Sequence, residues 1–134
     1  MCGMNAIRSP MAEAIATSLL PANVLVRSAG VHSGEPDPFV AVVIGERGLP
    51  PLAHDPQEMD EVGDGLFDLV IALSEDAHEH AQEMARTAHM AVEHWPMPDP
   101  STTEGRREQV LDAYRALADA LEARIKTRFG DAAQ

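Results

Sequence analysis

Apolar side chains in this chain recur at helical spacing in four stretches, which are separated by short apolar runs. The first stretch begins at Ser9, a predicted N-cap, with Pro10 at the first helical position and an apolar stripe that stops before Pro21. Capping residues and the same periodicity predict three further helices, at residues 38–47, 75–90 and 103–129.

Three apolar runs between these helices predict strands, at residues 24–26, 67–73 and 91–95. The run FDLVIAL at 67–73 is nearly continuous, which is typical of a strand covered on both faces. The alternation of strands and helices predicts an α/β fold, a three-layer sandwich with a parallel sheet and helices on both faces. We expect residues 1–134 to form a single domain.

The clearest candidate for chemistry is the segment CGMNAIRS at residues 2–9. Backbone N–H groups of a tight loop and of the following helix's first turn can converge on a phosphate, while the Arg8 guanidinium grips two of its oxygens. The same positive field would lower the pKa of the Cys2 thiol, so that a thiolate can attack phosphorus. A lone cysteine is more often a small buried hydrophobe, but the second position of a chain is poorly placed for burial.

A loop of this kind should follow a buried strand, yet only Met1 precedes Cys2 in the sequence. The expected sheet therefore has four strands, of which the first, central one is apparently missing from this chain. Either the chain is truncated at its start, or the fold tolerates a gap beneath the loop; we favour truncation. The choice bears on activity, because this strand fixes the base of the loop.

Composition narrows the class of partner. The chain has 22 acidic and 10 basic residues, a net charge of −12, which argues against nucleic acid or an anionic membrane as partner. Its single cysteine excludes an internal disulfide framework and suits a reducing compartment, so we expect a cytoplasmic protein. No apolar stretch approaches the roughly 18 residues of a membrane span, and no signal-peptide pattern is present at the start.

Several motifs occur in an order that resembles the low-molecular-weight protein tyrosine phosphatases, together with the arsenate reductases of the same fold. These motifs are C-x5-R-S-P-M-A-E-A at 2–14, S-A-G at 28–30, G-x-P-D-P at 34–38, R-G-L at 47–49 with His54 shortly after, F-D-L-V-I at 67–71 and W-P-M-P-D-P at 95–100. The resemblance covers almost the whole chain. It implies a four-stranded parallel sheet with helices on both faces and a phosphate loop at the carboxyl end of the first strand.

The resemblance also implies the catalytic residues: Cys2 as nucleophile, Arg8 as phosphate ligand and Asp99 as general acid on a late loop. Chemistry independently requires such an acid, because an alkoxide or phenolate leaves readily only when it receives a proton. From the residues alone, a turn former before the last helix is the favoured interpretation of Asp99, and the resemblance reverses this preference. The phosphate-binding segment comprises Gly3, Met4, Asn5, Ala6, Ile7, Arg8 and Ser9.

Three residues are expected to support this loop: Asn5, Ser9 and His54. Asparagine tolerates left-handed backbone better than most residues, which suits a loop with inward N–H groups. Ser9 can act as a helix cap, and in the family the matching hydroxyl also donates to the thiolate. His54 resembles a family histidine that hydrogen-bonds to the loop asparagine, with a surface loop histidine as the alternative.

We therefore predict a phosphomonoester hydrolase of the protein tyrosine phosphatase type, which acts through a phosphocysteine on a phosphorylated protein or small phosphomonoester. We expect no cofactor and no metal site, since His78 and His80 do not share a helix face. Met4 and the absence of a tyrosine soon after Asp99 distinguish this chain from many family members. Two alternatives remain: an arsenate reductase that uses an external thiol, and a non-catalytic phosphoprotein-binding module. The sequence does not fix the oligomeric state.

Overall fold

The computed structural model describes residues 2–4, 7–32, 37–51, 68–86 and 90–130. The elements in chain order are β1 (Cys2–Met4), α1 (Arg8–Leu19), β2 (Gly30–His32), α2 (Pro38–Glu46), β3 (Leu69–Ala72), α4 (Glu75–Ala85), β4 (Ala91–His94), the 3₁₀ helix η1 (Pro100–Thr102) and α5 (Arg107–Phe129). Strands and helices alternate along the chain, which confirms the predicted α/β class.

The strands form two parallel pairs. In the first pair, Cys2 of β1 lies opposite Gly30 of β2. In the second pair, β3 and β4 align over their whole lengths, with Leu69 opposite Ala91. The predicted parallel pairing is therefore confirmed, whereas the described residues show two separate pairs in place of one four-stranded sheet.

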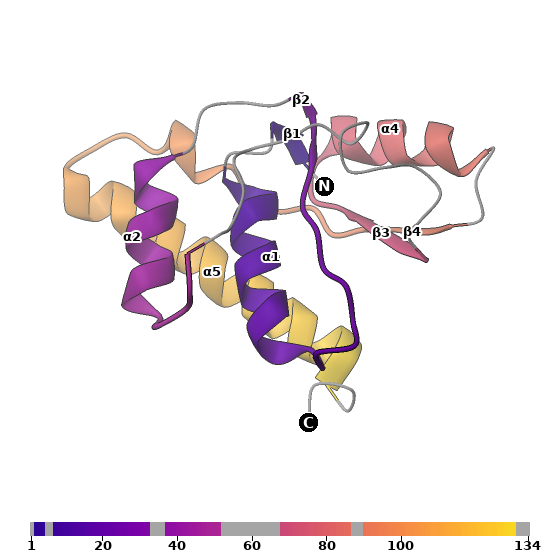
Figure 1. Cartoon of the computed structure of the whole chain (residues 1–134). Helices are drawn as coiled ribbons and strands as arrows, with labels where there is room; N and C mark the ends of the chain where they lie inside the picture. The colour runs from indigo at the N-terminus through magenta and orange to yellow at the C-terminus, as the bar shows by residue number, and fades with distance from the viewer. Residues whose placement is uncertain (1, 5–6, 33–36, 52–67, 87–89, 131–134) are drawn as a thin grey trace.

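Helices lie on two sides of these strands (Figure 1). One core cluster joins α1, α2 and α5, and its most deeply buried large side chains include Met11, Tyr114 and Leu121. A smaller cluster packs α4 against the other side, where Val70 and Ala72 of β3 meet its alanine residues. Burial on both sides explains why the β3 segment is almost continuously apolar.

The prediction of a strand at residues 24–26 is wrong. These residues lie in no strand, Val24 and Leu25 are 45% and 60% exposed, and the second strand is β2, farther along the chain. A strand needs a partner for its backbone N–H and C=O groups. The described partner, β1, begins only opposite Gly30, so it does not reach residues 24–26. The first strand that the structure describes, β1, is short and contains Cys2 itself.

Two helix starts also differ from prediction. Ser9 is not the N-cap, because α1 begins at Arg8 and the Met11 N–H already donates to the Ile7 carbonyl at 3.1 Å. Pro10 still lies in the first turn, where its missing N–H costs no intrahelical bond. The last helix, α5, starts later than predicted because η1 and Gly105, with a φ of +128°, precede it.

The other boundaries agree more closely with the sequence. Asp37 caps α2 by accepting from the Phe39 N–H at 2.8 Å, and Gly48, with a φ of +70°, follows its end as predicted. Ser74 caps α4, but this helix ends at Ala85 and so falls short of the predicted end at residue 90. Residue 67, the first of the predicted third strand, lies outside the described residues.

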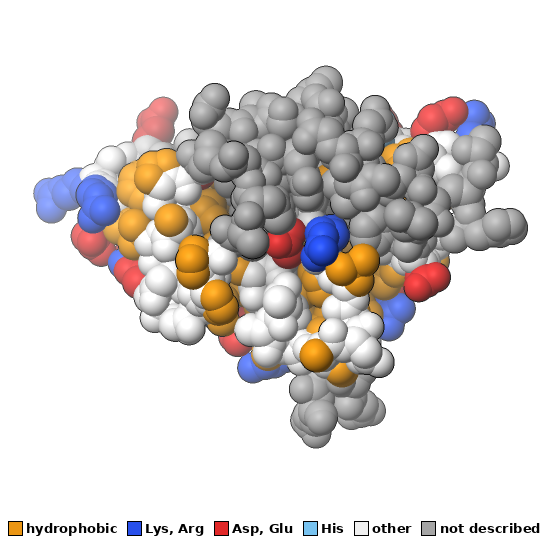
Figure 2. Space-filling model, viewed as in Figure 1, with side chains coloured by type: hydrophobic (Ala, Val, Ile, Leu, Met, Phe, Trp, Pro, Cys, Tyr) orange, Lys and Arg blue, Asp and Glu red, His pale blue; other side chains and the backbone are white. Residues whose placement is uncertain are grey.

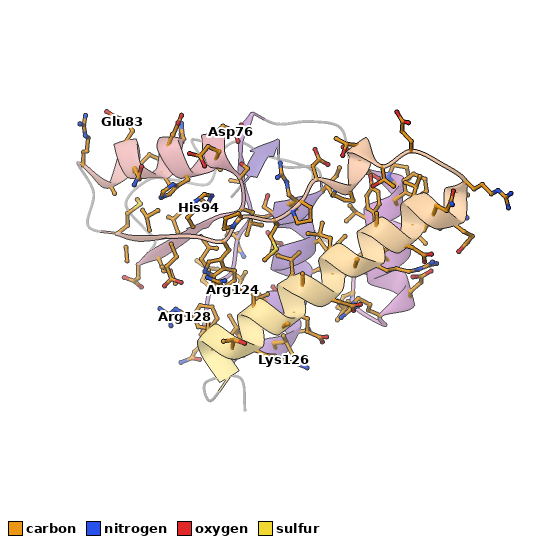
Figure 3. All side chains as sticks on the ribbon, turned by 180° about the vertical axis from the view of Figure 1, so that it is seen from behind. Asp76, Glu83, His94, Arg124, Lys126 and Arg128 are labelled. Atoms are coloured by element: carbon orange, nitrogen blue, oxygen red, sulfur yellow. The ribbon has the colours of Figure 1, made fainter. Side chains whose placement is uncertain are left out.

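Glu93 holds the C-terminal end of α5 against β4. One carboxylate oxygen accepts from the Trp95 indole N–H at 3.1 Å, and the other accepts from Arg128 Nε at 2.9 Å. The guanidinium of Arg124 lies 5.1 Å from the centre of the Trp95 ring. Seen from behind, Arg124 and Arg128 extend from α5 on the side of β4 (Figure 3). Trp95 is consequently 2% exposed.

Candidate active site

The predicted phosphate-binding residues lie at the junction of β1 and α1. Cys2, Gly3 and Met4 form β1, Ile7 is the N-cap of α1, and Arg8 is its first helical residue. Asn5 and Ala6 of the loop, together with His54, lie outside the described residues. A helix that follows a strand in this way directs the free N–H groups of its first turn toward the connecting loop.

Besides its free N–H groups, the start of α1 has a positive charge that favours an anion. Its first turn contains no acidic side chain, so no carboxylate of the first turn itself offsets the partial positive charge of the helix end. Arg8 adds a full positive charge there. Local positive potential therefore exists at this point of a chain whose net charge is −12.

Arg8 connects α1 to the loop that carries Asp99. Its side chain is half-buried, and Nη1 donates to the Met97 carbonyl at 3.0 Å. Met97 lies two positions before Asp99 in the chain, so the structure brings two of the three predicted catalytic residues into one region. A guanidinium has five N–H donors, so this one bond leaves others for an anion.

Asp99 performs the turn-forming role that the sequence allowed as the alternative. Its Oδ1 atom accepts from the Ser101 backbone N–H at 2.9 Å and from the Ser101 hydroxyl at 2.6 Å, which caps η1. Among the described residues, no hydrogen bond to its second oxygen, Oδ2, is present. The carboxylate is half-buried. Oδ1 caps η1, and Oδ2 is the oxygen that would carry the proton of a general acid. The general-acid role of Asp99 is therefore compatible with this geometry and stays a prediction.

Ser9 connects the start of α1 to the segment that precedes β2. It is 2% exposed, and its hydroxyl donates to the Ala29 carbonyl at 3.3 Å. This contact supports the junction between β1, β2 and α1 from the side. Ser9 therefore joins α1 to the segment before β2 and does not cap the helix, and its role in supporting the loop stays a prediction.

Tyr114 also lies near the site, and it was not predicted there. Its hydroxyl donates to Asp37 Oδ2 at 2.8 Å, which links the middle of α5 to the N-terminus of α2. Burial raises the pKa of the Tyr114 hydroxyl, and the hydrogen bond to Asp37 and the charges of Asp37 and Asp99 act in the same direction. The feature of the sequence that could have indicated this contact is a hydroxyl group within the apolar stripe of α5, because a buried tyrosine usually has a polar partner.

The N-terminus of α4 lies close to the same region. The Ser74 hydroxyl donates to Asp76 Oδ1 at 2.6 Å, and this bond is the main reason why the pKa of Asp76 is below its usual range. The positive charge of Arg8 contributes in the same direction. Asp76 therefore places a carboxylate within electrostatic reach of the predicted phosphate ligand.

His78 of α4 contacts His94 of β4. It is half-buried, and its ring stacks on His94 at a centroid distance of 4.3 Å. The Nε2 atom of His94 is buried, and no described residue forms a hydrogen bond with it. In the part of the chain that the structure describes, no three His, Cys, Asp or Glu side chains gather as metal ligands would. Within the same residues, no helix is both long enough and apolar enough to cross a membrane.

Known proteins resemble this chain in both sequence and structure. A sequence profile of the family described as low molecular weight phosphotyrosine protein phosphatase matches residues 1–131. An arsenate reductase of Bacillus licheniformis is 31% identical over 132 residues, which are 98% of this chain and 92% of that protein.

Solved structures show the same fold. The YwlE mutant from Bacillus subtilis matches with a TM-score of 0.80 and 26% identity, over 97% of this chain and 93% of that chain. The tyrosine phosphatase Wzb from Escherichia coli K30, solved in complex with sulphate, matches with a TM-score of 0.77 and 22% identity, over 97% of this chain and 92% of that chain. The chain therefore belongs to the low molecular weight phosphotyrosine protein phosphatase family.

Proposed function

We propose that this protein is a cysteine-dependent phosphomonoester hydrolase, in which Cys2 attacks phosphorus and Arg8 holds the phosphate oxygens. The observation that supports this most is the position of Arg8. It is the first residue of α1, it follows β1 after a short loop, and it contacts the loop of Asp99. Family membership supports the same assignment.

The proposed reaction has two steps. The Cys2 thiolate forms a bond to phosphorus while the bond to the leaving oxygen breaks, and Asp99 donates a proton to that oxygen. Water then attacks the phosphocysteine, Asp99 takes back a proton, and inorganic phosphate leaves with the thiolate restored. Loop N–H groups and the Arg8 guanidinium stabilise the charge on the equatorial oxygens in both steps.

The substrate class is a phosphorylated protein or a small phosphomonoester. Ser101 and Thr102, which follow the Asp99 turn, are exposed and provide no aromatic surface beside the leaving group. We therefore propose that binding energy comes mainly from the phosphate itself, and that aryl and alkyl phosphates differ in rate chiefly through the acidity of the leaving alcohol.

Arsenate reduction is the second candidate, because a relative that covers nearly the whole chain at 31% identity is an arsenate reductase. Arsenate has the shape and charge of phosphate, so the same loop can hold it. The Cys2 thiolate would displace hydroxide from arsenate, and an external thiol would then attack the Cys2 sulfur. This step would release arsenite and leave a mixed disulfide. A second external thiol would regenerate Cys2, since the chain contains one cysteine.

The decisive experiment compares wild type with Cys2→Ser on two substrates. We expect wild type to release p-nitrophenol from its phosphate ester without added thiol, and Cys2→Ser to lose this turnover while it still binds inorganic phosphate. Thiol-dependent arsenite formation without phosphate-ester turnover would establish the second candidate. Turnover of neither substrate, with phosphate binding retained, would indicate a non-catalytic binding module, and full activity of Cys2→Ser would refute the proposed nucleophile.

A further inference from the structure

Arg106 and Arg107 place two positive charges side by side at the start of α5. Arg106 is the N-cap residue of this helix, Arg107 is its first helical residue, and both side chains are exposed. Basic side chains extend over the start of α5 on the surface, next to apolar side chains over α2 (Figure 2). The chain has 22 acidic residues and 10 basic ones, so this arginine pair is a local excess of positive charge on a negatively charged molecule.

The packing of the helices does not explain the arginine pair. Arg47 and Arg115 bind carboxylates of neighbouring helices. Neither Arg106 nor Arg107 forms an ion pair with a residue in the part of the chain that the structure describes. The charge of Arg107 acts on Glu46, but Glu46 pairs directly with Arg115 at 2.7 Å. A positive charge at a helix N-terminus also opposes the helix dipole, so the arginine pair contributes no stability to α5 in that way.

A series of contacts connects the arginine pair to the proposed general acid. The Arg107 guanidinium lies 5.9 Å from the centre of the Phe39 ring, and the centres of the Phe39 and Tyr114 rings are 5.2 Å apart. Burial is the main reason why the pKa of Tyr114 is raised, and the charge of Asp99 contributes, so Asp99 is within electrostatic reach of this tyrosine. The helix η1, which Asp99 caps, packs on α5. The arginine pair therefore lies beside the Asp99 turn, where the leaving group of a substrate would be.

The contact of Arg107 with Phe39 leaves its hydrogen-bond donors available. A guanidinium over an aromatic ring is attracted through its charge, and its N–H groups point outward in the guanidinium plane. Phe39 is half-buried, so the ring is a fixed support for the exposed arginine. Planar N–H groups of this kind bind the two oxygens of a carboxylate in parallel.

We propose that Arg106 and Arg107 bind acidic side chains that flank the phosphorylated residue of a polypeptide substrate. The inference rests on the proposed function, since it assigns the kind of polypeptide that the same site prefers. The net charge of −12 predicts the opposite preference, because it repels an acidic polypeptide as a whole. A preference for acidic flanking residues would therefore report local binding by the arginine pair and not the charge of the molecule.

The test compares two short fluorescent peptides that share a central phosphotyrosine. One has glutamate at the flanking positions on both sides, and the other has glutamine there. Their binding to the full chain with Cys2→Ser is measured by fluorescence polarisation, so the result does not require turnover. The glutamate peptide should bind about three- to tenfold more tightly at low salt, because each exposed ion pair contributes a factor of about two to five. Added sodium chloride should reduce this difference.

Substitutions in the same Cys2→Ser chain localise the effect. Arg106→Gln together with Arg107→Gln should abolish or reverse the preference for the glutamate peptide. The matched control is Arg27→Gln, which removes a positive charge from an exposed position before β2 and should keep the preference.

Three results would overturn the proposal: equal or weaker binding of the glutamate peptide when both arginines are present, no binding of either peptide, or an equal loss of preference in Arg27→Gln. Wild-type turnover of p-nitrophenyl phosphate separates this inference from the proposed function. A preference for glutamate that disappears with the arginine pair, in a chain without turnover, would refute the hydrolase and support the arginine pair as a binding surface. Turnover without the preference would refute the binding surface alone.

Discussion

Arg8 joins three parts of the candidate site through one side chain. It begins α1, it donates to the Met97 carbonyl on the loop of Asp99, and its charge acts on Asp76 at the start of α4. The planar guanidinium can make such a bond and still present two parallel N–H groups to an oxyanion. The geometry of the side chain therefore matters as much as its charge.

Arg8→Lys should consequently lower kcat/KM for a phosphomonoester by about 10²–10³-fold, because an ammonium group cannot hold two oxygens in a fixed plane. Steady-state kinetics on p-nitrophenyl phosphate measure this loss. The matched control is Arg27→Lys, since its one side-chain hydrogen bond among the described residues is to its neighbour, the Val26 carbonyl. Activity of Arg8→Lys within a few-fold of wild type would mean that Arg8 does not bind the phosphate.

Asp99→Asn separates the two roles of Asp99. Asparagine caps a helix about as well as aspartate, so η1 should keep its structure, but it cannot donate a proton from a carboxyl group. We expect alkyl phosphates, which have poor leaving groups, to slow by about 10²–10⁴-fold, and activated aryl phosphates to slow much less. Equal losses for both classes of ester would leave Asp99 as a turn former only.

At the scale of elements, α5 is the helix that holds the rest together. Tyr114 ties its middle to the cap of α2. Arg47, at the end of α2, pairs with Asp119 at 3.0 Å and with Glu122 at 2.9 Å, so the two helices are joined at both ends of α2. The buried hydrogen bond should contribute more than the ion pairs, because Asp119 is largely exposed and solvent screens its charge.

Tyr114→Phe should lower the free energy of unfolding by about 1–2 kcal/mol, because Asp37 loses a hydrogen bond in a buried setting. The pKa of Tyr114 is raised above its ordinary value of 10.0. The hydrogen bond of Tyr114 therefore makes its whole contribution to the free energy of unfolding below about pH 10. This contribution is lost as the pH rises further and the hydroxyl ionises. Urea unfolding between pH 7 and pH 11 should show this decline in wild type and not in Tyr114→Phe, since the chain has one tyrosine. Parallel curves for both proteins would contradict this assignment.

Local signals explain which elements were predictable. The caps Asp37 and Ser74 are encoded next to the helices they start, so α2 and the beginning of α4 followed from the sequence. The strand predicted at 24–26 failed because pairing depends on a partner distant in sequence, which no local pattern reports. In the site, the order of loop and helix around Arg8 was predictable from residues 2–9, whereas the strand that contains Cys2 was not. The contact of Arg8 with Met97 was not, since 89 positions separate them.

At the scale of the whole molecule, the negative net charge disfavours the approach of the proposed anionic substrate. The net charge of −12 repels phosphate monoesters at long range, while Arg8 and the N-terminus of α1 attract them at short range. Salt screens the first effect over about 10 Å at 0.1 M and affects the second much less. The two contributions can therefore be separated by ionic strength.

We expect kcat/KM for a dianionic phosphate ester to rise at least about twofold between 10 and 200 mM sodium chloride. Initial rates at low substrate concentration measure this quantity, with sodium chloride chosen because its anion resembles phosphate poorly. A fall in kcat/KM over this range would show that local attraction already governs the encounter.

Trp95 gives the molecule a natural optical reporter. It is the single tryptophan of the chain, and its ring is 2% exposed against the core, beneath the Arg124 guanidinium. It also directly precedes the loop of Asp99. Its fluorescence should therefore lie toward short wavelengths in the native state. Unfolding and movement of the Asp99 loop can each be followed by its emission and by acrylamide quenching, without attaching a dye.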